Sequence, residues 1–138
     1  MTKTQVRSNS APAPVGPYSQ AVLTEGFVFA SGQLGIDPAT GSMPPTVEAQ
    51  AQLALDNLKA VLEEGGSSLD RVVRTTVLLA DMKDFAKVNG IYARYFTEPF
   101  PARAAYQVAG LPLGGACGDR GNSPFRKGLT CWGLSGQR

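Results

Sequence analysis

Hydrophobic and polar residues alternate along several short stretches of the chain, as they do in β-strands that bury one face. The clearest case is residues 27–34, where Phe27 and Phe29 fall on one face, and the tight turn Glu25-Gly26 comes directly before it. A later stretch is rich in β-branched residues and apolar at most positions, which is typical of a central strand covered by helices. We expect strands over residues 20–24, 27–34, 72–80 and 104–109.

A different period, with apolar residues three and four positions apart, indicates two amphipathic helices. Thr46 is a suitable cap for a helix that runs to about residue 64, where Gly65-Gly66 ends it. The second helix opens at Asp81 and continues to about residue 96, before two prolines. The predicted inner faces are Ala51, Ala54, Leu55, Leu58, Val61 and Leu62 in the first helix, and Phe85, Val88, Tyr92 and Tyr95 or Phe96 in the second.

The predicted elements follow one another as β-β-α-β-α-β, and both helices then pack on one face of a single mixed sheet. The fold class is therefore α+β, a sandwich of two layers. The length of 138 residues suits one compact domain. Two helices cover only one face of the sheet, so oligomerisation is the simplest way to cover the other.

Composition removes several classes of function. The chain has no His, which excludes Ser-His and Cys-His nucleophilic pairs and zinc sites that contain His. Its two Cys, Cys117 and Cys131, are too few for a disulfide framework or a four-Cys metal site. The sequence shows neither a leader peptide nor an apolar run that could span a bilayer, so we expect a cytoplasmic protein without a membrane partner.

The net charge of +2 is unevenly distributed. Residues 116–138 carry +3, and the remaining residues together carry −1. A nucleic-acid binder normally presents a basic face on its folded domain, so this distribution argues against a nucleic-acid partner.

Several motifs, in order from about residue 11 to residue 115, resemble the Rid/YjgF family. The most specific is P-A-R-A-A-Y-Q-V-A at residues 101–109. The others are G-P-Y-S-Q at 16–20, F-A-S-G-Q at 29–33, N-L-K-A-V-L at 57–62, T-T-V-L-L-A-D-M at 75–82, V-N-G-I-Y at 88–92 and Y-F at 95–96.

The resemblance implies a subunit with a chorismate-mutase-like fold that assembles as a homotrimer, with an active site in each cleft between subunits. The implied reaction is the hydrolysis of reactive enamine/imine intermediates, such as 2-aminoacrylate/2-iminopropanoate and 2-iminobutanoate, to 2-oxo acids and ammonia. Imines hydrolyse in water unaided, so positioning and charge stabilisation suffice and no metal or cofactor is expected.

Five residues match the family's cleft positions. The resemblance implies catalytic roles for Arg103 and Tyr18, and substrate binding by Arg103, Ser31, Gly32 and Asn89. A 2-imino acid has a planar carboxylate, which the planar guanidinium of arginine can bind with two parallel hydrogen bonds. Each residue also has a purely structural interpretation. Arg103 is then an ion-pair partner and Tyr18 a half-buried aromatic residue, Ser31 and Gly32 mark a close strand crossing, and Asn89 is a helix residue that caps a loop.

The resemblance ends after Gly115, and we therefore divide the chain into a Rid/YjgF domain at 1–115 and a divergent tail at 116–138. The family continues with a strand of the type L-V-E-I-E-A-I-A, whose first Glu is its acid/base or water-positioning group, and Gly118 stands at that place. Glycines and Pro124 oppose a strand here, so we expect an irregular tail, a missing last strand and docking of at most Trp132 or Leu134.

Residues 116–125 can be encoded so that the same bases, read one position later, spell L-V-E-I-E-A-I-A-L. We hypothesise that this C-terminus is an out-of-frame reading of an ordinary family member, which the transcript sequence would decide. Without the Glu, we expect reduced deaminase activity. Two alternatives stay open: an RNA-directed role as an endoribonuclease or translation inhibitor, and a non-catalytic, chaperone-like role.

Overall fold

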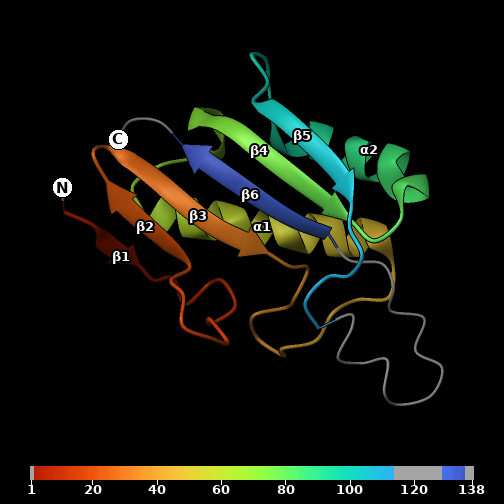
Figure 1. The fold of residues 1–138 in the computed structure, drawn as a ribbon, viewed down its shortest axis with the longest axis horizontal. Coiled ribbons are helices and arrows are strands. Elements are labelled where there is room, and N and C mark those ends of the chain that lie inside the picture. Colours follow the sequence, from red (N-terminus) through yellow and green to blue (C-terminus); the bar gives the residue numbers. More distant parts are fainter. Residues whose placement is uncertain (1, 114–128, 136–138) are drawn as a thin grey trace.

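The computed structural model describes residues 2–113 and 129–135 and shows a two-layer α+β sandwich (Figure 1). One sheet contains six strands in the order β1-β2-β3-β6-β4-β5. The pair β4/β5 is parallel and the other pairs are antiparallel, so the sheet is mixed, as predicted. The strands are β1 (Thr4–Val6), β2 (Ala21–Thr24), β3 (Phe27–Gln33), β4 (Val72–Leu79), β5 (Ala102–Gln107) and β6 (Leu129–Ser135).

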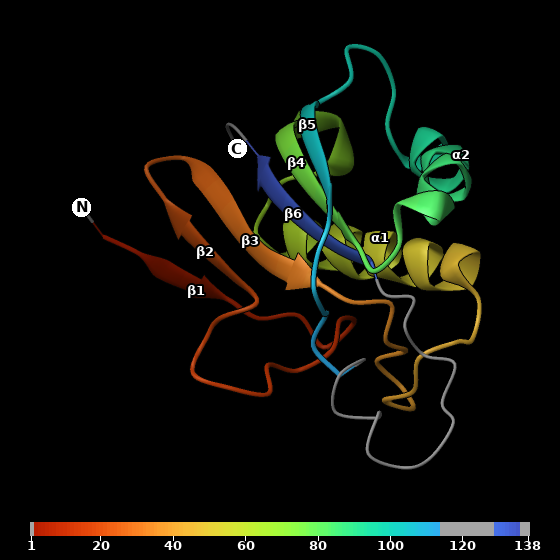
Figure 2. The ribbon, with the colours of Figure 1, turned by 45° about the vertical axis from the view of Figure 1, so that its right-hand side comes forward.

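Both long helices, α1 (Val47–Glu64) and α2 (Phe85–Tyr95), lie on the same side of this sheet (Figure 2). The Thr46 hydroxyl caps α1 by accepting from the Ala49 N–H at 3.3 Å. The helix ends before Gly66, which adopts a left-handed φ of +78° that favours glycine. The predicted cap and end of this helix are therefore confirmed.

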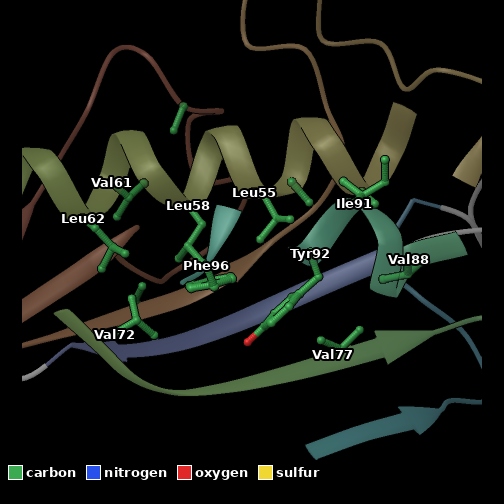
Figure 3. Close-up of a cluster of buried hydrophobic side chains, with 14 of the residues drawn as sticks. Leu55, Leu58, Val61, Leu62, Val72, Val77, Val88, Ile91, Tyr92 and Phe96 are labelled. Carbon is green, nitrogen blue, oxygen red and sulfur yellow. The ribbon is translucent and has the colours of Figure 1, made fainter. Parts of the chain in front are cut away.

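The hydrophobic core fills the space between the helices and the sheet (Figure 3). Val28 and Ala30 of β3 and Val77 and Leu79 of β4 face the helices and are buried. The predicted inner face of α1 is buried throughout. In the second helix, Val88, Tyr92 and Phe96 are buried and Phe85 and Tyr95 are partly buried against the same core. The 3.6-residue period therefore identified the correct helix faces.

Four local features differ from the sequence expectation. Strand β1 was not predicted, because three residues are too few to show an alternation. The second helix begins with a 3₁₀ turn at Met82–Asp84, in which the Asp81 carboxylate accepts from the Lys83 N–H at 2.8 Å. A second 3₁₀ turn, Leu69–Arg71, precedes β4, and β5 begins two residues earlier than predicted.

The expectation of a missing last strand is wrong. Strand β6 lies between β3 and β4 and pairs with both in antiparallel fashion (Figure 1). Without it, both neighbours would expose unpaired N–H and C=O groups, so this gap strongly favours any extended segment that reaches it. The sequence L-T-C-W-G-L-S contains enough strand-forming residues to fill it. The proposed domain boundary at residue 115 and the side chains of Trp132 and Leu134 lie outside what the structure describes.

Tyr95 of α2 joins the two helices, because its hydroxyl donates to the Asp56 carboxylate of α1 at 2.7 Å. Burial raises the pKa of Tyr95 above its ordinary value, and the hydrogen bond and negative charge of Asp56 raise it further. The unfolded chain loses this proton near pH ~10. The stabilisation is therefore complete below that pH and is lost as the pH rises through the higher pKa of the folded protein.

We expect the free energy of unfolding to fall as the pH rises from about 10 to about 12, and Tyr95→Phe to make this fall smaller. Urea unfolding of both proteins across this range measures the difference. Identical pH profiles for the two proteins would contradict the assignment.

Within the described ranges, no helix has the length and hydropathy needed to cross a membrane.

Candidate functional site

The candidate residues Tyr18, Ser31 and Gly32 line one hollow of about 570 Å³ on the surface. Its walls come from three segments of the chain: residues 12–20, residues 31–41, and Pro112 with Leu113 after β5. Most of these side chains are apolar. The polar groups belong to the end of β3, to the loop before β2 and to Asp37 after β3. The hollow thus combines an apolar wall with a few polar groups, as small-molecule sites do.

Two buried amides hold the walls of this hollow. The Gln20 side chain, 2% exposed, accepts from the Ser8 N–H at 2.7 Å and donates to the Pro12 carbonyl at 2.8 Å, which fixes the N-terminal arm. Asn57 of α1 donates to the carbonyls of Leu34 at 3.0 Å and Ile36 at 2.8 Å. Both loops are therefore positioned by the folded core before any ligand arrives.

We expect Asn57→Ala to destabilise the protein by about 2–4 kcal/mol, because two partly buried carbonyls lose their donor. This corresponds to a fall in Tm of about 10 °C for a domain of this size, measured by circular dichroism. Gln52→Ala is the matched control, since Gln52 lies exposed on the same helix, and its Tm should stay within about 2 °C of the wild type. Equal shifts for the two variants would show that the amide does not anchor the loop.

The polar side chains of the hollow are available for hydrogen bonding to a ligand. Tyr18 is 49% exposed, and its hydroxyl accepts only a long hydrogen bond of 3.4 Å from the Val15 N–H. The Ser31 hydroxyl donates to the Ser19 carbonyl at 2.6 Å, which leaves its oxygen able to accept from a ligand. Beside it, Gly32 has no side chain, so a ligand can approach the backbone closely.

The other two candidates, Arg103 and Asn89, meet beside α2. Arg103 is the second residue of β5, and its Nη1 donates to the Asn89 Oδ1 at 2.8 Å. The centre of the guanidinium lies 4.8 Å from the ring centroid of Tyr92 and 5.5 Å from that of Phe85. In the described part of the chain, no carboxylate forms an ion pair with Arg103. Its charge is therefore held in place without being neutralised, which suits an anionic ligand.

These two groups of residues lie apart within one protomer. Strands β3 and β5 are separated by β6 and β4, and three steps of about 4.8 Å between neighbouring strands amount to about 14 Å. Their settings in the sheet also differ: Arg103 pairs with the buried Thr75 on the helix side, whereas Ser31 lies in the irregularity between Ala30 and Gln33, where the register of β3 with β6 shifts. A ligand that contacts both groups in a single chain would therefore have to span about three strand spacings.

Motif recognition did not reveal Phe85 and Tyr92 as partners of Arg103, or Gln20 and Asn57 as anchors of the hollow. Tyr92 is three residues after Asn89 and therefore shares its helix face, which was the available signal. The partners of the buried amides depend on contacts between distant segments, and no local pattern predicts those.

The comparisons with known proteins agree with this architecture. A family model described as Endoribonuclease L-PSP matches residues 8–116. The chain therefore belongs to the endoribonuclease L-PSP family, which is the Rid/YjgF family of the sequence resemblance. The family match ends at residue 116, next to the point where the motifs stop.

Individual members of the L-PSP family are similar over most of their length. The 2-iminobutanoate/2-iminopropanoate deaminase of Bos taurus is 51% identical over 111 residues, which are 80% of this chain and 81% of the relative. The crystal structure of an L-PSP protein from Entamoeba histolytica has a TM-score of 0.86 at 43% identity and covers 98% of this chain and 99% of its own. That of E. coli TdcF with bound serine has a TM-score of 0.84 at 31% identity, covering 98% and 99%.

Proposed function

We propose that this protein hydrolyses 2-imino acids, such as 2-iminopropanoate and 2-iminobutanoate, to 2-oxo acids and ammonia. The observation that carries the proposal is the guanidinium of Arg103, which is held by Asn89 and two aromatic rings and has no carboxylate partner in the described part of the chain. The deaminase name of the bovine relative supports the reaction. The serine bound to TdcF supports the substrate class, because serine likewise has a carboxylate next to a carbon that bears nitrogen.

In the proposed reaction, water adds to the carbon of the C=N bond and the nitrogen takes up a proton. The resulting carbinolamine then loses ammonia as the C–N bond breaks and the carbonyl forms. Arg103 holds the substrate carboxylate, and Asn89 holds Arg103. Tyr18 and the Ser31 hydroxyl orient the water and the nitrogen from the hollow.

We further propose that the site forms between protomers of a homotrimer, with the hollow of one chain facing Arg103 and Asn89 of a neighbour. The separation of the two groups within one chain supports this arrangement. The open face of the sheet supports it as well, because aromatic residues there are exposed: Phe27 and Phe29 on β3, with ring centroids 6.3 Å apart, and Tyr106 on β5. A monomeric protein rarely exposes such a group on one face.

Strand β6 limits the chemistry, because its sequence L-T-C-W-G-L-S offers no carboxylate. The resemblance assigns a Glu to the last strand of the family. In the proposed reaction, where β6 takes the place of that strand, this protein works without the Glu carboxylate. Binding and orientation then supply the catalysis. We expect kcat to be lower than that of the bovine relative measured side by side.

The test is a coupled assay in which a pyridoxal-phosphate-dependent dehydratase generates 2-iminopropanoate from serine. Semicarbazide traps the imine that has not been hydrolysed, and we expect the protein to reduce the trapped fraction in proportion to its concentration. If the trapped fraction is unchanged, the deaminase proposal fails. Cleavage of single-stranded RNA by the same preparation would favour the RNA-directed alternative instead.

A further inference from the structure

The guanidinium of Arg103 rests on an aromatic residue that is itself anchored in the core. Thr75 of β4 and Arg103 of β5 are directly opposite one another in the parallel pairing. Tyr92 of α2 reaches both: its hydroxyl lies 2.8 Å from the Thr75 hydroxyl, and its ring centroid lies 4.8 Å from the guanidinium. Figure 3 shows the Tyr92 oxygen directed toward β4. One side chain thus connects the core, the helix and the cation.

We propose that Tyr92 is a positioning residue, which sets the affinity of the site for the substrate carboxylate by fixing the place of the Arg103 guanidinium. This inference rests on the proposed function, since it assumes that Arg103 binds the carboxylate of a 2-imino acid. It adds a residue that none of the motif-derived site positions includes.

The Tyr92 ring has little freedom to move. Its side chain is 6% exposed, its hydroxyl is bonded to a buried partner, and the ring of Phe96 lies 4.4 Å away. An arginine free in solvent would have to be ordered when the substrate binds, and that entropy would reduce the affinity. Here the guanidinium is ordered as the protein folds, because the ring beneath it cannot shift.

The type of contact also preserves the charge of Arg103. A carboxylate partner would compete with the substrate and occupy the N–H groups of the guanidinium. An aromatic face attracts a cation through its quadrupole and takes up none of those donors. Asn89 accepts one N–H, so the others stay available for a planar carboxylate.

The experiment separates this role from simple packing. We expect Tyr92→Leu, which removes the ring, to raise KM for 2-iminopropanoate about tenfold and to leave kcat within about threefold of the wild type. Tyr92→Phe keeps the ring and loses the hydroxyl, so its KM should stay within about threefold although its Tm falls. Tyr95→Leu is the matched control, because it makes the same change on the same helix at a side chain that faces α1.

Two kinetic results would overturn the proposal: an unchanged KM in Tyr92→Leu, or an equal rise of KM in Tyr95→Leu.

A second measurement uses the wild-type protein and does not depend on the folding of the Tyr92 variants. By NMR, the Arg103 Nη–H protons, assigned with Arg103→Lys, should give separate signals shifted upfield by the aromatic rings. A single averaged signal at the random-coil position would show that the guanidinium is not held.

The failure of this inference is distinguishable from the failure of the proposed function. If Arg103→Ala retains deaminase activity, the proposed function of Arg103 is wrong, and the role of Tyr92 falls with it. If Arg103→Ala is inactive and Tyr92→Leu has the wild-type KM, only the positioning role is wrong.

Discussion

Replacing Arg103 by Ala should lower kcat/KM for 2-iminopropanoate at least about 100-fold. A guanidinium that binds a carboxylate through two charged hydrogen bonds contributes about 3 kcal/mol, and this converts to a factor of that size. The fold should not suffer, because Arg103 is exposed on an edge strand and Tyr92 keeps its hydrogen bond to Thr75. The measurement is the coupled dehydratase assay, with the Tm as a check on folding.

Two further variants define what Arg103 contributes. Arg103→Lys keeps the charge and loses the planar pair of donors, so we expect it to recover only part of the activity. Arg94→Ala removes an exposed arginine from α2, away from the cluster with Asn89, and should leave kcat/KM within about twofold. If Arg103→Ala keeps more than a third of the wild-type kcat/KM, the carboxylate is bound elsewhere.

Periodicity alone predicted the layered fold well. The stripe on α1 and the alternation on β3 each reflect a segment with one buried face, and such segments show their structure in the local sequence. The local sequence of β6 does not predict a strand. This segment is favoured as a strand because it fills the gap between β3 and β4, and that gap exists only in the assembled sheet. The glycines and the proline of residues 116–128 also led us to predict an irregular tail, although a strand follows them at residues 129–135.

The candidate site was predictable in its residues and unpredictable in its arrangement. The P-A-R motif identified Arg103, and the V-N-G-I-Y motif identified Asn89, and these two are in contact. That Ser31 and Arg103 lie three strand steps apart follows from the strand order. The strand order is a long-range property of the fold, which no local motif predicts.

The second large effect concerns the proposed site between protomers: we expect Phe29→Asp to convert the proposed homotrimer to a monomer and to lower kcat/KM more than about 100-fold. Phe29 is 43% exposed on the open face of the sheet, beside the ring of Phe27. Burying a phenylalanine in an interface contributes about 1.5–3 kcal/mol, and each subunit of a closed ring loses that term. An unpaired carboxylate at the same place opposes association further.

Light scattering coupled to size exclusion measures the mass, and the deaminase assay is run on the same fractions. Phe100→Asp is the control, because Phe100 is also exposed, at 53%, but lies in the loop between α2 and β5 and not on a strand of the sheet. This variant should keep the mass and the activity of the wild type. A Phe29→Asp monomer with full activity would contradict the proposal. It would show that one chain holds a complete site for the three-carbon substrate, despite the separation of about three strand spacings, roughly 14 Å, between the two groups.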